Sequence, residues 1–241
     1  MNEKAEQAIV LHSGGQDSST CLAWAIREFG AENVRPLTIF YGQRHEIEMK
    51  CAAEICADLD LPEPEILPLE ALSLLEAAAL TSPEIEVSGD ATGTGNVFAE
   101  EHGLPSTFVP GRNLLLFTLA AAYGAKFGAY NIVSGVCETD AAGYPDCRGS
   151  FVLAAQIAIS EALAHGVEIH APLLHRSKAE TFALAEELGV LELILKKSHT
   201  CYRGNHEALH AWGYGCGECP ACHEREKGWI GFEASREISA S

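Results

Sequence analysis

The segment Ser13-Gly14-Gly15-Gln16-Asp17-Ser18 constrains the fold of this chain more than any other. It follows residues 7–12, where the apolar run AIVL predicts a strand, and leads into residues 17–29, whose apolar spacing predicts a helix that Gly30 ends. Two glycines let the backbone turn sharply between the two elements. The first N–H groups of the helix have no partners within it and carry partial positive charge. This arrangement is typical of an anion-binding loop in an α/β protein.

We expect this loop to bind the phosphates of a nucleotide. The hydroxyls of Ser13 and Ser18 add donors, and Asp17 can either cap the helix or hold a Mg²⁺ ion that bridges phosphates. An ordinary glycine-rich turn is the simpler alternative, but it leaves six matching positions unexplained. The segment has neither the Gly-Lys-Ser/Thr ending of a Walker A motif nor a GxGxxG pattern. The predicted nucleotide-binding residues are His12, Ser13, Gly14, Gly15, Gln16, Asp17, Ser18 and Ser19.

The rest of the chain predicts a doubly covered parallel sheet. Predicted strands and helices alternate, which favours an α/β, Rossmann-like fold with helices on both faces of the sheet. Residues 80–111 are rich in Gly, Thr, Ser and Pro and predict a lid or a disordered loop. We expect a main domain over 1–198 and a small C-terminal region over 199–241. Beyond the first pair, strands are predicted at 34–41, 65–67, 130–134 and 168–173, and helices at 43–59, 112–127, 151–165 and 177–188.

Four of the nine cysteines lie in the last fifth of the chain and predict a metal site. Cys216, Cys219 and Cys222 form a CxxCxxC pattern that cannot complete a tetrahedral site alone, and Cys201 is the nearest fourth thiolate. Four thiolates favour a structural zinc ion in a small knuckle packed on the main domain. A [4Fe–4S] cluster and unligated thiols remain alternatives. A histidine could also replace Cys201, the candidates being His199, His206, His210 and His223.

The charge of the chain limits its partners. The formal net charge is −18 with 16 Lys and Arg, so DNA and RNA are disfavoured as main partners, whereas a small phosphorylated ligand is compatible with local backbone donors. No apolar run approaches the ~20 residues of a membrane span, and the N-terminus lacks the pattern of a signal peptide. We therefore expect a cytoplasmic protein without a membrane partner.

Polar segments follow the predicted strands or open the predicted helices at four further places. Each alone is more often a solvated loop, but parallel sheets bind ligands at the carboxyl ends of their strands, so four together favour a site. The segments are Tyr41-Gly42-Gln43-Arg44-His45, Pro110-Gly111-Arg112-Asn113, Gly143-Tyr144-Pro145-Asp146-Cys147-Arg148 and Arg176-Ser177-Lys178-Ala179-Glu180.

Together the motifs resemble the 7-cyano-7-deazaguanine synthase (QueC) family, which belongs to the PP-loop ATP pyrophosphatases. The resemblance covers residues 9 to about 225. It implies the PP-loop fold, also called HUP, a four-cysteine zinc site and a homodimer. It also implies that ATP, 7-carboxy-7-deazaguanine and ammonia are the substrates, and that adenylation drives conversion of the carboxylate to an amide and then to a nitrile. The matching segments are SGGQDSSTCL, FYGQRH, FVPGRNLLLFTLAA, SGVCETDAAGYPDCR, SKAE and TCY with CGECPAC.

The resemblance also suggests roles for individual residues. It places phosphate binding at residues 13–18, with Mg²⁺ accompanying ATP, and zinc at Cys201, Cys216, Cys219 and Cys222. From motif position and side-chain chemistry we assign catalysis to Asp17, Arg112 and Lys178, and substrate binding to Arg44, Tyr144, Asp146 and Arg148. Two features depart from the family pattern: residues 203–215 form a longer segment than usual, and Ala142 stands where Ser is common.

Three other functions compete with this interpretation. A QueC-like ligase could join the same carboxylate to a protein or another amine, and sequence separates the two poorly. A tRNA-thiolating PP-loop enzyme needs a metal-free reactive cysteine and a basic surface, which the net charge disfavours. A zinc-knuckle nucleic-acid binding module leaves the phosphate loop unexplained and needs clustered Lys and Arg.

Overall fold

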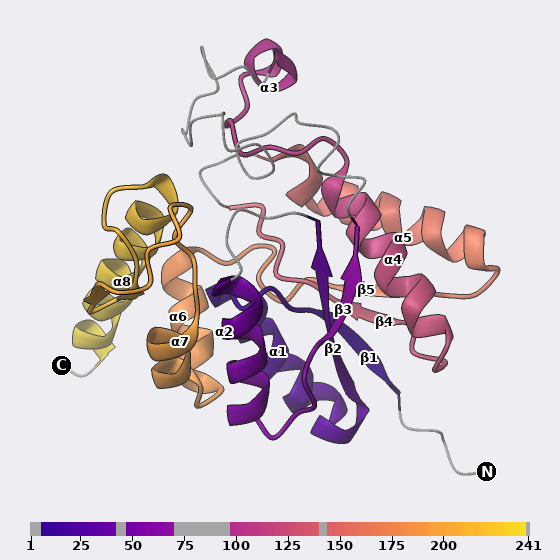
Figure 1. Ribbon diagram of the computed structural model, residues 1–241, viewed down its shortest axis with the longest axis horizontal. Helices are drawn as coiled ribbons and strands as arrows, with labels where there is room; N and C mark the ends of the chain where they lie inside the picture. The colour runs from indigo at the N-terminus through magenta and orange to yellow at the C-terminus, as the bar shows by residue number, and fades with distance from the viewer. Residues whose placement is uncertain (1–5, 42–46, 70–96, 140–143, 240–241) are drawn as a thin grey trace.

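Five parallel strands form the central sheet of the computed structural model, which describes residues 6–41, 47–69, 97–139 and 144–239 (Figure 1). Their spatial order is β3-β2-β1-β4-β5, which confirms the predicted parallel sheet. The strands are β1 (Ala8–Leu11), β2 (Val34–Phe40), β3 (Glu65–Pro68), β4 (Asn131–Val133) and β5 (Glu168–His170).

The order of the strands reverses at β1. Ala8 pairs with Val34 of β2 on one side and with Asn131 of β4 on the other, and both pairings are parallel. The chain first builds outward from β1 to β2 and β3, and then returns to add β4 and β5 on the opposite side. Such a reversal leaves a crevice at the carboxyl ends of the two central strands, where open α/β sheets bind their ligands.

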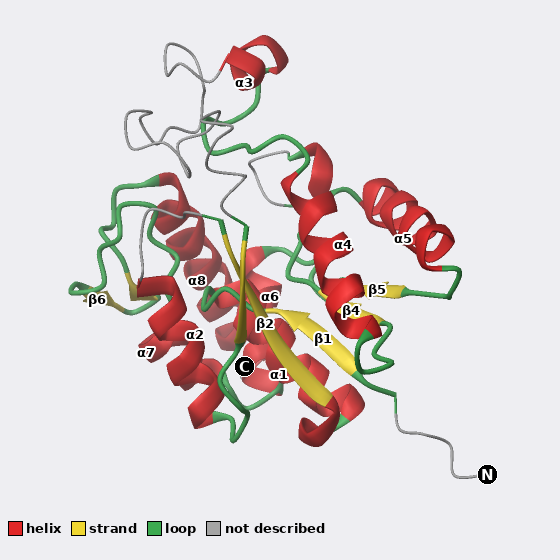
Figure 2. Cartoon of the chain, turned by 45° about the vertical axis from the view of Figure 1, so that its right-hand side comes forward, coloured by secondary structure: helices red, strands yellow, loops and turns green. Residues whose placement is uncertain are grey.

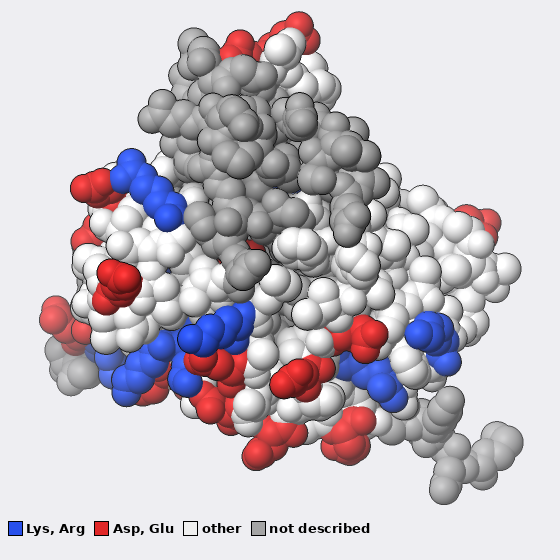
Figure 3. All heavy atoms as spheres, in the orientation of Figure 1, with Lys and Arg blue, Asp and Glu red and all other residues white. Residues whose placement is uncertain are grey.

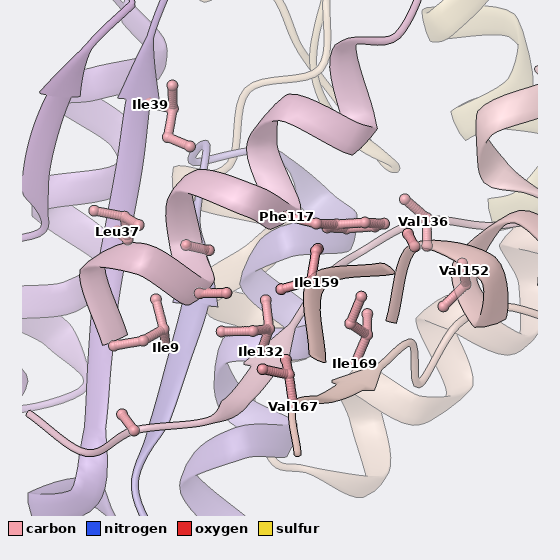
Figure 4. Packing of buried hydrophobic residues seen from close by; sticks show 14 residues of the cluster. Ile9, Leu37, Ile39, Phe117, Ile132, Val136, Val152, Ile159, Val167 and Ile169 are labelled. Carbon is pink, nitrogen blue, oxygen red and sulfur yellow. The ribbon is translucent and has the colours of Figure 1, made fainter. Parts of the chain in front are cut away.

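Helices cover both faces of the sheet (Figures 1 and 2). Because successive side chains of a strand point to opposite faces, β1 contributes to two cores. Ile9 packs with Phe117 and Ile159 on the side of α4 and α5 (Figure 4), whereas Val10 packs with Leu22 on the side of α1 and α2. These helices are α1 (Gln16–Phe29), α2 (Ile47–Asp58), α4 (Arg112–Ala125), α5 (Gly149–Leu163) and α6 (Lys178–Glu187), the last packing on the α1 side.

The C-terminal region contains elements that the sequence did not predict. A hairpin lies within residues 203–215, and a 20-residue helix, α8, ends the described chain and packs along α6. These elements share a core with α6 that includes Phe182, Trp212 and Phe232. The domain boundary at 198/199 stays a prediction. The additional elements are α7 (Leu191–Lys197), β6 (Leu209–His210), β7 (Gly213–Tyr214) and α8 (Pro220–Ser239), with α3 (Val97–His102) and the short 3₁₀ turns η1 (Ala31–Asn33) and η3 (Pro145–Cys147) elsewhere.

Of the segment predicted as a lid or loop, residues 80–96 lie outside the described residues, and residues 97–102 form α3. No helix among the described residues combines the length and apolar character needed to cross a bilayer. On the face that Figure 3 shows, the described Lys and Arg side chains are interspersed with Asp and Glu.

Close backbone packing at Gly14 leads to a stability prediction. Gly14 has a φ of +81°, and a Cβ there would lie 2.4 Å from the carbonyl oxygen of Glu48 and 2.7 Å from the nitrogen of Ala52. Gly14→Ala adds a collision with main chain to a strained backbone, so we expect a loss of at least about 3 kcal/mol in the free energy of unfolding.

Gly189→Ala is the matched control, because Gly189 has a φ of +74° with nothing within 4 Å of the added Cβ. Backbone strain alone predicts a loss of about 1–2 kcal/mol there. Urea denaturation compares the two variants, and equal losses would contradict the role of the α2 backbone.

Candidate functional site

A cavity of about 660 Å³ opens at the carboxyl ends of the central strands. Its walls come from the β1–α1 loop, the end of β4, and the starts of α4, α6 and α8, segments that are far apart in the sequence. Two predicted nucleotide-binding residues lie just behind the wall, since Gly14 packs on α2 and the Ser19 hydroxyl donates to the carbonyl of Gly15 at 2.7 Å. The predicted residues that line the cavity are His12, Ser13, Gly15, Gln16, Asp17, Ser18, Arg112, Tyr144 and Lys178.

The β1–α1 loop presents an uncapped helix start to this cavity. Gly15 is the N-cap of α1 and offers no side chain to the first N–H groups of the helix. The two serine hydroxyls brace the loop, because the N–H of Ser13 donates to Ser18 Oγ at 3.2 Å and the N–H of Gly15 donates to Ser13 Oγ at 3.3 Å. The helix start therefore has donors and partial positive charge available for an anion.

Asp17 does not cap the helix but forms an ion pair with Lys178. Lys178 Nζ lies 2.6 Å from Asp17 Oδ2, and Asp17 Oδ1 is buried without a hydrogen-bond partner among the described residues. A capping box between Ser177 and Glu180 fixes the start of α6 and so holds Lys178 in place. A buried carboxylate oxygen without a partner suits a hard cation such as Mg²⁺.

The start of α4 places a cation in a mixed aromatic and acidic setting. Burial lowers the pKa of Arg112, but the neighbouring Tyr41, Tyr144 and Asp146 outweigh it and hold that pKa above its ordinary value. Burial also raises the pKa of Glu48 to about 7, against the opposing effect of Arg112. Arg112 is thus a permanent charge at the cavity, next to a carboxyl group that can be neutral at physiological pH.

The GYPDCR segment contacts the start of α4, and not all of it reaches the cavity. The hydroxyl of Tyr144 hydrogen-bonds Thr107 Oγ1. The carboxylate of Asp146 accepts a hydrogen bond from the backbone N–H of Asn113 at 3.2 Å. The backbone carbonyl of Asp146 accepts a second one from Asn113 Nδ2 at 2.9 Å. Asp146 and the exposed Arg148 are not among the cavity-lining residues. Arg44, Ala142 and Gly143 lie outside the described residues.

Four thiols converge in the C-terminal region. The sulfur atoms of Cys201, Cys216, Cys219 and Cys222 all lie within 4.8 Å of one another, and the Cys216–Cys222 distance is 3.8 Å. A tetrahedral ion with Zn–S bonds of about 2.3 Å requires sulfur atoms roughly 3.8 Å apart. Backbone N–H groups of residues 218 and 219 donate to Cys216 Sγ, as expected for a thiolate ligand. The predicted four-cysteine set therefore fits a metal ion.

Two of the histidines that could have replaced Cys201 as a metal ligand have a ring nitrogen within hydrogen-bond distance of a backbone carbonyl. His199 Nε2 lies 2.9 Å from the carbonyl of Cys201, and His210 Nε2 lies 3.1 Å from the carbonyl of Gly215. The geometry favours Cys201 as the fourth ligand.

The C-terminal region that contains the four cysteines, residues 199–239, directly contacts the β1–α1 loop, and we refer to it as the metal-binding region because its cysteines could hold a metal ion. The backbone N–H of His199 donates to the carbonyl of Gly14 at 2.9 Å, two residues before the first cysteine of the cluster. Thr200, Tyr202 and Arg225 from the same region line the cavity. Glu48 and Arg225 were not predicted as site residues. Their positions are the signal that the sequence offers, since Glu48 follows the FYGQRH segment and Arg225 lies three residues after Cys222.

Comparison with known proteins supports one family. The family model described as "Queuosine biosynthesis protein QueC" matches residues 7–233. A 7-cyano-7-deazaguanine synthase from Nitrobacter winogradskyi is 48% identical over 227 residues, which cover 92% of this chain and 93% of that protein. A protein of the same name from Gluconacetobacter diazotrophicus is 48% identical over 241 residues, covering 95% of this chain and 93% of that protein.

Solved structures show more distant likeness. An NH3-dependent NAD synthetase from Campylobacter jejuni aligns with a TM-score of 0.44 and 18% identity, covering 80% of this chain and 68% of that one. A likeness at this level carries no argument about the site.

The buried imidazole of His12 leads to a pH prediction. Burial lowers the pKa of His12 from 6.5 to about 4. As the pH falls from 6.5 to 4, the unfolded chain gains a proton at His12 that the folded chain does not, so this residue makes folding less favourable. His12→Gln removes the effect. As the pH falls through this window, we expect the free energy of unfolding of the variant to rise relative to that of the unaltered protein by about 1.4 kcal/mol per pH unit.

Urea denaturation at several pH values measures this difference, in which groups that titrate equally in both proteins cancel. A difference that stays constant between pH 6.5 and 4 would contradict a neutral His12.

Proposed function

The chain belongs to the QueC family of queuosine biosynthesis proteins, and from that membership we propose that it is a 7-cyano-7-deazaguanine synthase. Such an enzyme uses ATP to convert 7-carboxy-7-deazaguanine and ammonia to 7-cyano-7-deazaguanine. The observation that carries the proposal is the single cavity in which an uncapped helix start, the Asp17–Lys178 pair and Arg112 meet, in a chain that resembles these synthases over nearly its whole length. The alternative ligase acting on a protein or another amine is not favoured.

The start of α1 is proposed to bind the phosphates of ATP. Its free N–H groups and the glycine backbone provide donors without side chains in the way, and Asp17 Oδ1 would hold the accompanying Mg²⁺. Lys178 and Arg112 would stabilise negative charge that develops as the phosphoryl group is transferred. The carboxylate of the substrate thereby gains a leaving group, first for attack by ammonia and then, after a second activation, for loss of the amide oxygen.

The deazaguanine is proposed to lie on the α4 side of the cavity. Tyr144 and Ile39 line this part and offer apolar surface for a planar base. Arg112 is the nearby cation for the carboxylate. The assignment of Arg44, Tyr144, Asp146 and Arg148 to substrate binding stays a prediction. Of the three that the structure describes, Tyr144 lines the cavity and Asp146 and Arg148 do not.

We further propose that the four-cysteine cluster holds a structural zinc ion. Zinc prefers four thiolates in a closed tetrahedral site, and the sulfur spacing suits it. None of the nine cysteines, all of which lie among the described residues, forms a disulfide bond, which suits the reducing compartment that we propose, the cytoplasm.

A homodimer is the assembly that we propose for this chain. α4 and α5 expose apolar side chains at helical spacing, among them Leu114, Leu153 and Ile157, which are 41%, 57% and 56% exposed. A second copy of the chain packed on this face would remove them from water.

The function is tested by incubating the protein with ATP, Mg²⁺, ammonium and 7-carboxy-7-deazaguanine and analysing the products by mass spectrometry. We expect the nitrile, the amide intermediate and a stoichiometric loss of ATP. Asp17→Asn should lower turnover at least about 100-fold, because the phosphate loop loses a charge that its cations and Mg²⁺ require. Glu28→Gln, at the exposed end of the same helix, should retain turnover. Consumption of ATP without nitrile would contradict the proposed reaction.

Metal analysis tests the second proposal. We expect about one zinc per chain, lost in Cys219→Ser together with thermal stability, because a structural ion contributes its binding energy to folding. Cys56→Ala is the control, since this buried thiol lies in another core and should leave the zinc content unchanged. Iron in place of zinc, or full zinc in Cys219→Ser, would refute the assignment.

A further inference from the structure

Besides α4, whose first residue is Arg112, three helices begin at the cavity wall. Gln16 and Asp17 lie in the first turn of α1, Lys178 is the first residue of α6, and Pro220 and Ala221 open α8. Each helix start carries partial positive charge, which favours an anion in this cavity although the net charge of the chain is −18. α8 belongs to the metal-binding region, which therefore forms part of this wall.

A buried cation on α8 adds to this field. Arg225 is 1% exposed and lines the cavity. Its Nη1 donates to Thr200 Oγ1 at 2.9 Å, and its Nη2 donates to Ser198 Oγ at 3.0 Å and to the carbonyl of Ile194 at 3.2 Å. All three acceptors are neutral. Its Nε is buried without a hydrogen-bond partner among the described residues.

Arg225 forms no direct ion pair among the described residues. Burial lowers the pKa of its guanidinium to about 10, although the charges of Asp17 and Cys222 oppose this effect. That same carboxylate already forms a 2.6 Å ion pair with Lys178. A buried guanidinium without a direct ion pair is costly, and a bound anion in the cavity would supply one. The unpartnered Nε–H is the donor left for that anion.

We propose that Arg225 binds the triphosphate of ATP, and the pyrophosphate released from it, from the side of the metal-binding region. This inference rests on the proposed use of ATP. In adenylation a carboxylate oxygen bonds to the α-phosphorus, the bond from that phosphorus to the bridging oxygen breaks, and pyrophosphate leaves with the electron pair. Arg225 faces the charge that develops on this leaving group, opposite the start of α1, and the metal-binding region becomes a working part of the nucleotide site.

The rigidity of its surroundings supports a binding role. A Cβ on Gly213 would lie 2.4 Å from Nη2 of Arg225, so the hairpin of β6 and β7 packs directly against the guanidinium. The segment that its hydrogen bonds hold, residues 198–200, includes the N–H donor to the carbonyl of Gly14. Arg225 is therefore preorganised beside the phosphate loop, which lowers the cost of ordering it when an anion binds.

The experiment measures binding of inorganic pyrophosphate with Mg²⁺ by calorimetry, using the full metal-loaded chain. Arg225→Gln keeps polar groups for its neighbours and removes the charge. We expect its affinity for pyrophosphate to fall about 10–100-fold, as for the loss of a charge-assisted hydrogen bond. Arg236→Gln is the matched control on the same helix, because Arg236 is 52% exposed and pairs with Glu186 and Glu233, and its affinity should stay within about twofold.

Metal content and thermal stability of each variant are measured alongside. A purely structural role predicts that Arg225→Gln loses stability while its pyrophosphate affinity is unchanged, and that result overturns the proposal. So does an unaltered protein that does not bind pyrophosphate. If Arg225→Gln does not fold, unaltered protein labelled with ¹⁵N-arginine decides, since pyrophosphate should shift a slowly exchanging Nε–H signal and the absence of a shift overturns the proposal.

These readouts are independent of turnover. A protein that forms no nitrile but binds pyrophosphate through Arg225 contradicts the proposed reaction and supports this inference. If the protein forms nitrile, and pyrophosphate binds equally to the unaltered protein and to Arg225→Gln, the result supports the proposed reaction and contradicts this inference.

Discussion

The main-chain contacts around Gly14 hold the site together. On one side, the start of α2 approaches so closely that a Cβ on Gly14 would collide with the carbonyl of Glu48. On the other side, the N–H of His199 donates to the carbonyl of Gly14 at 2.9 Å. The loop is thus fixed between a helix of the sheet domain and the first residues of the metal-binding region. Because both contacts involve main chain, they leave the donors at the start of α1 directed to the cavity.

This arrangement explains how an acidic protein can bind a highly charged nucleotide. The net charge of −18 acts over the whole surface and is weakened by salt, whereas the charges at the cavity act at short range in a partly dehydrated space. Arg112, Lys178 and Arg225 enter from three separate helices, each near its N-terminal end. These three cations therefore converge on one concave site, whereas a nucleic acid requires an extended basic surface.

Sequence patterns predicted the elements that regular apolar spacing, paired glycines or closely spaced cysteines mark. The strand–loop–helix unit at residues 8–29 and the four-cysteine set are of this kind, because each requires particular residue types at neighbouring positions. α8 was missed for the opposite reason. Its buried positions include Cys222, Arg225, Gly228 and Phe232, so a charged residue and a glycine occupy places where an apolar stripe would reveal a helix. Arg225 was missed with it, since its neighbours come from α7 and the following segment.

The GYPDCR segment shows that a specific motif and a ligand contact are different properties. Asp146 is buried and accepts from the N–H of Asn113, one residue after Arg112 at the start of α4. A carboxylate at that position accepts a hydrogen bond from a free N–H of the helix and interacts favourably with the partial positive charge at the helix start. The aspartate therefore fixes the helix turn that carries Arg112 to the cavity. The PGRN and GYPDCR segments depend on each other through this contact. Asp146 therefore has a reason to be specific without lining the cavity, whereas Arg112, Asn113, Tyr144 and Cys147 line it.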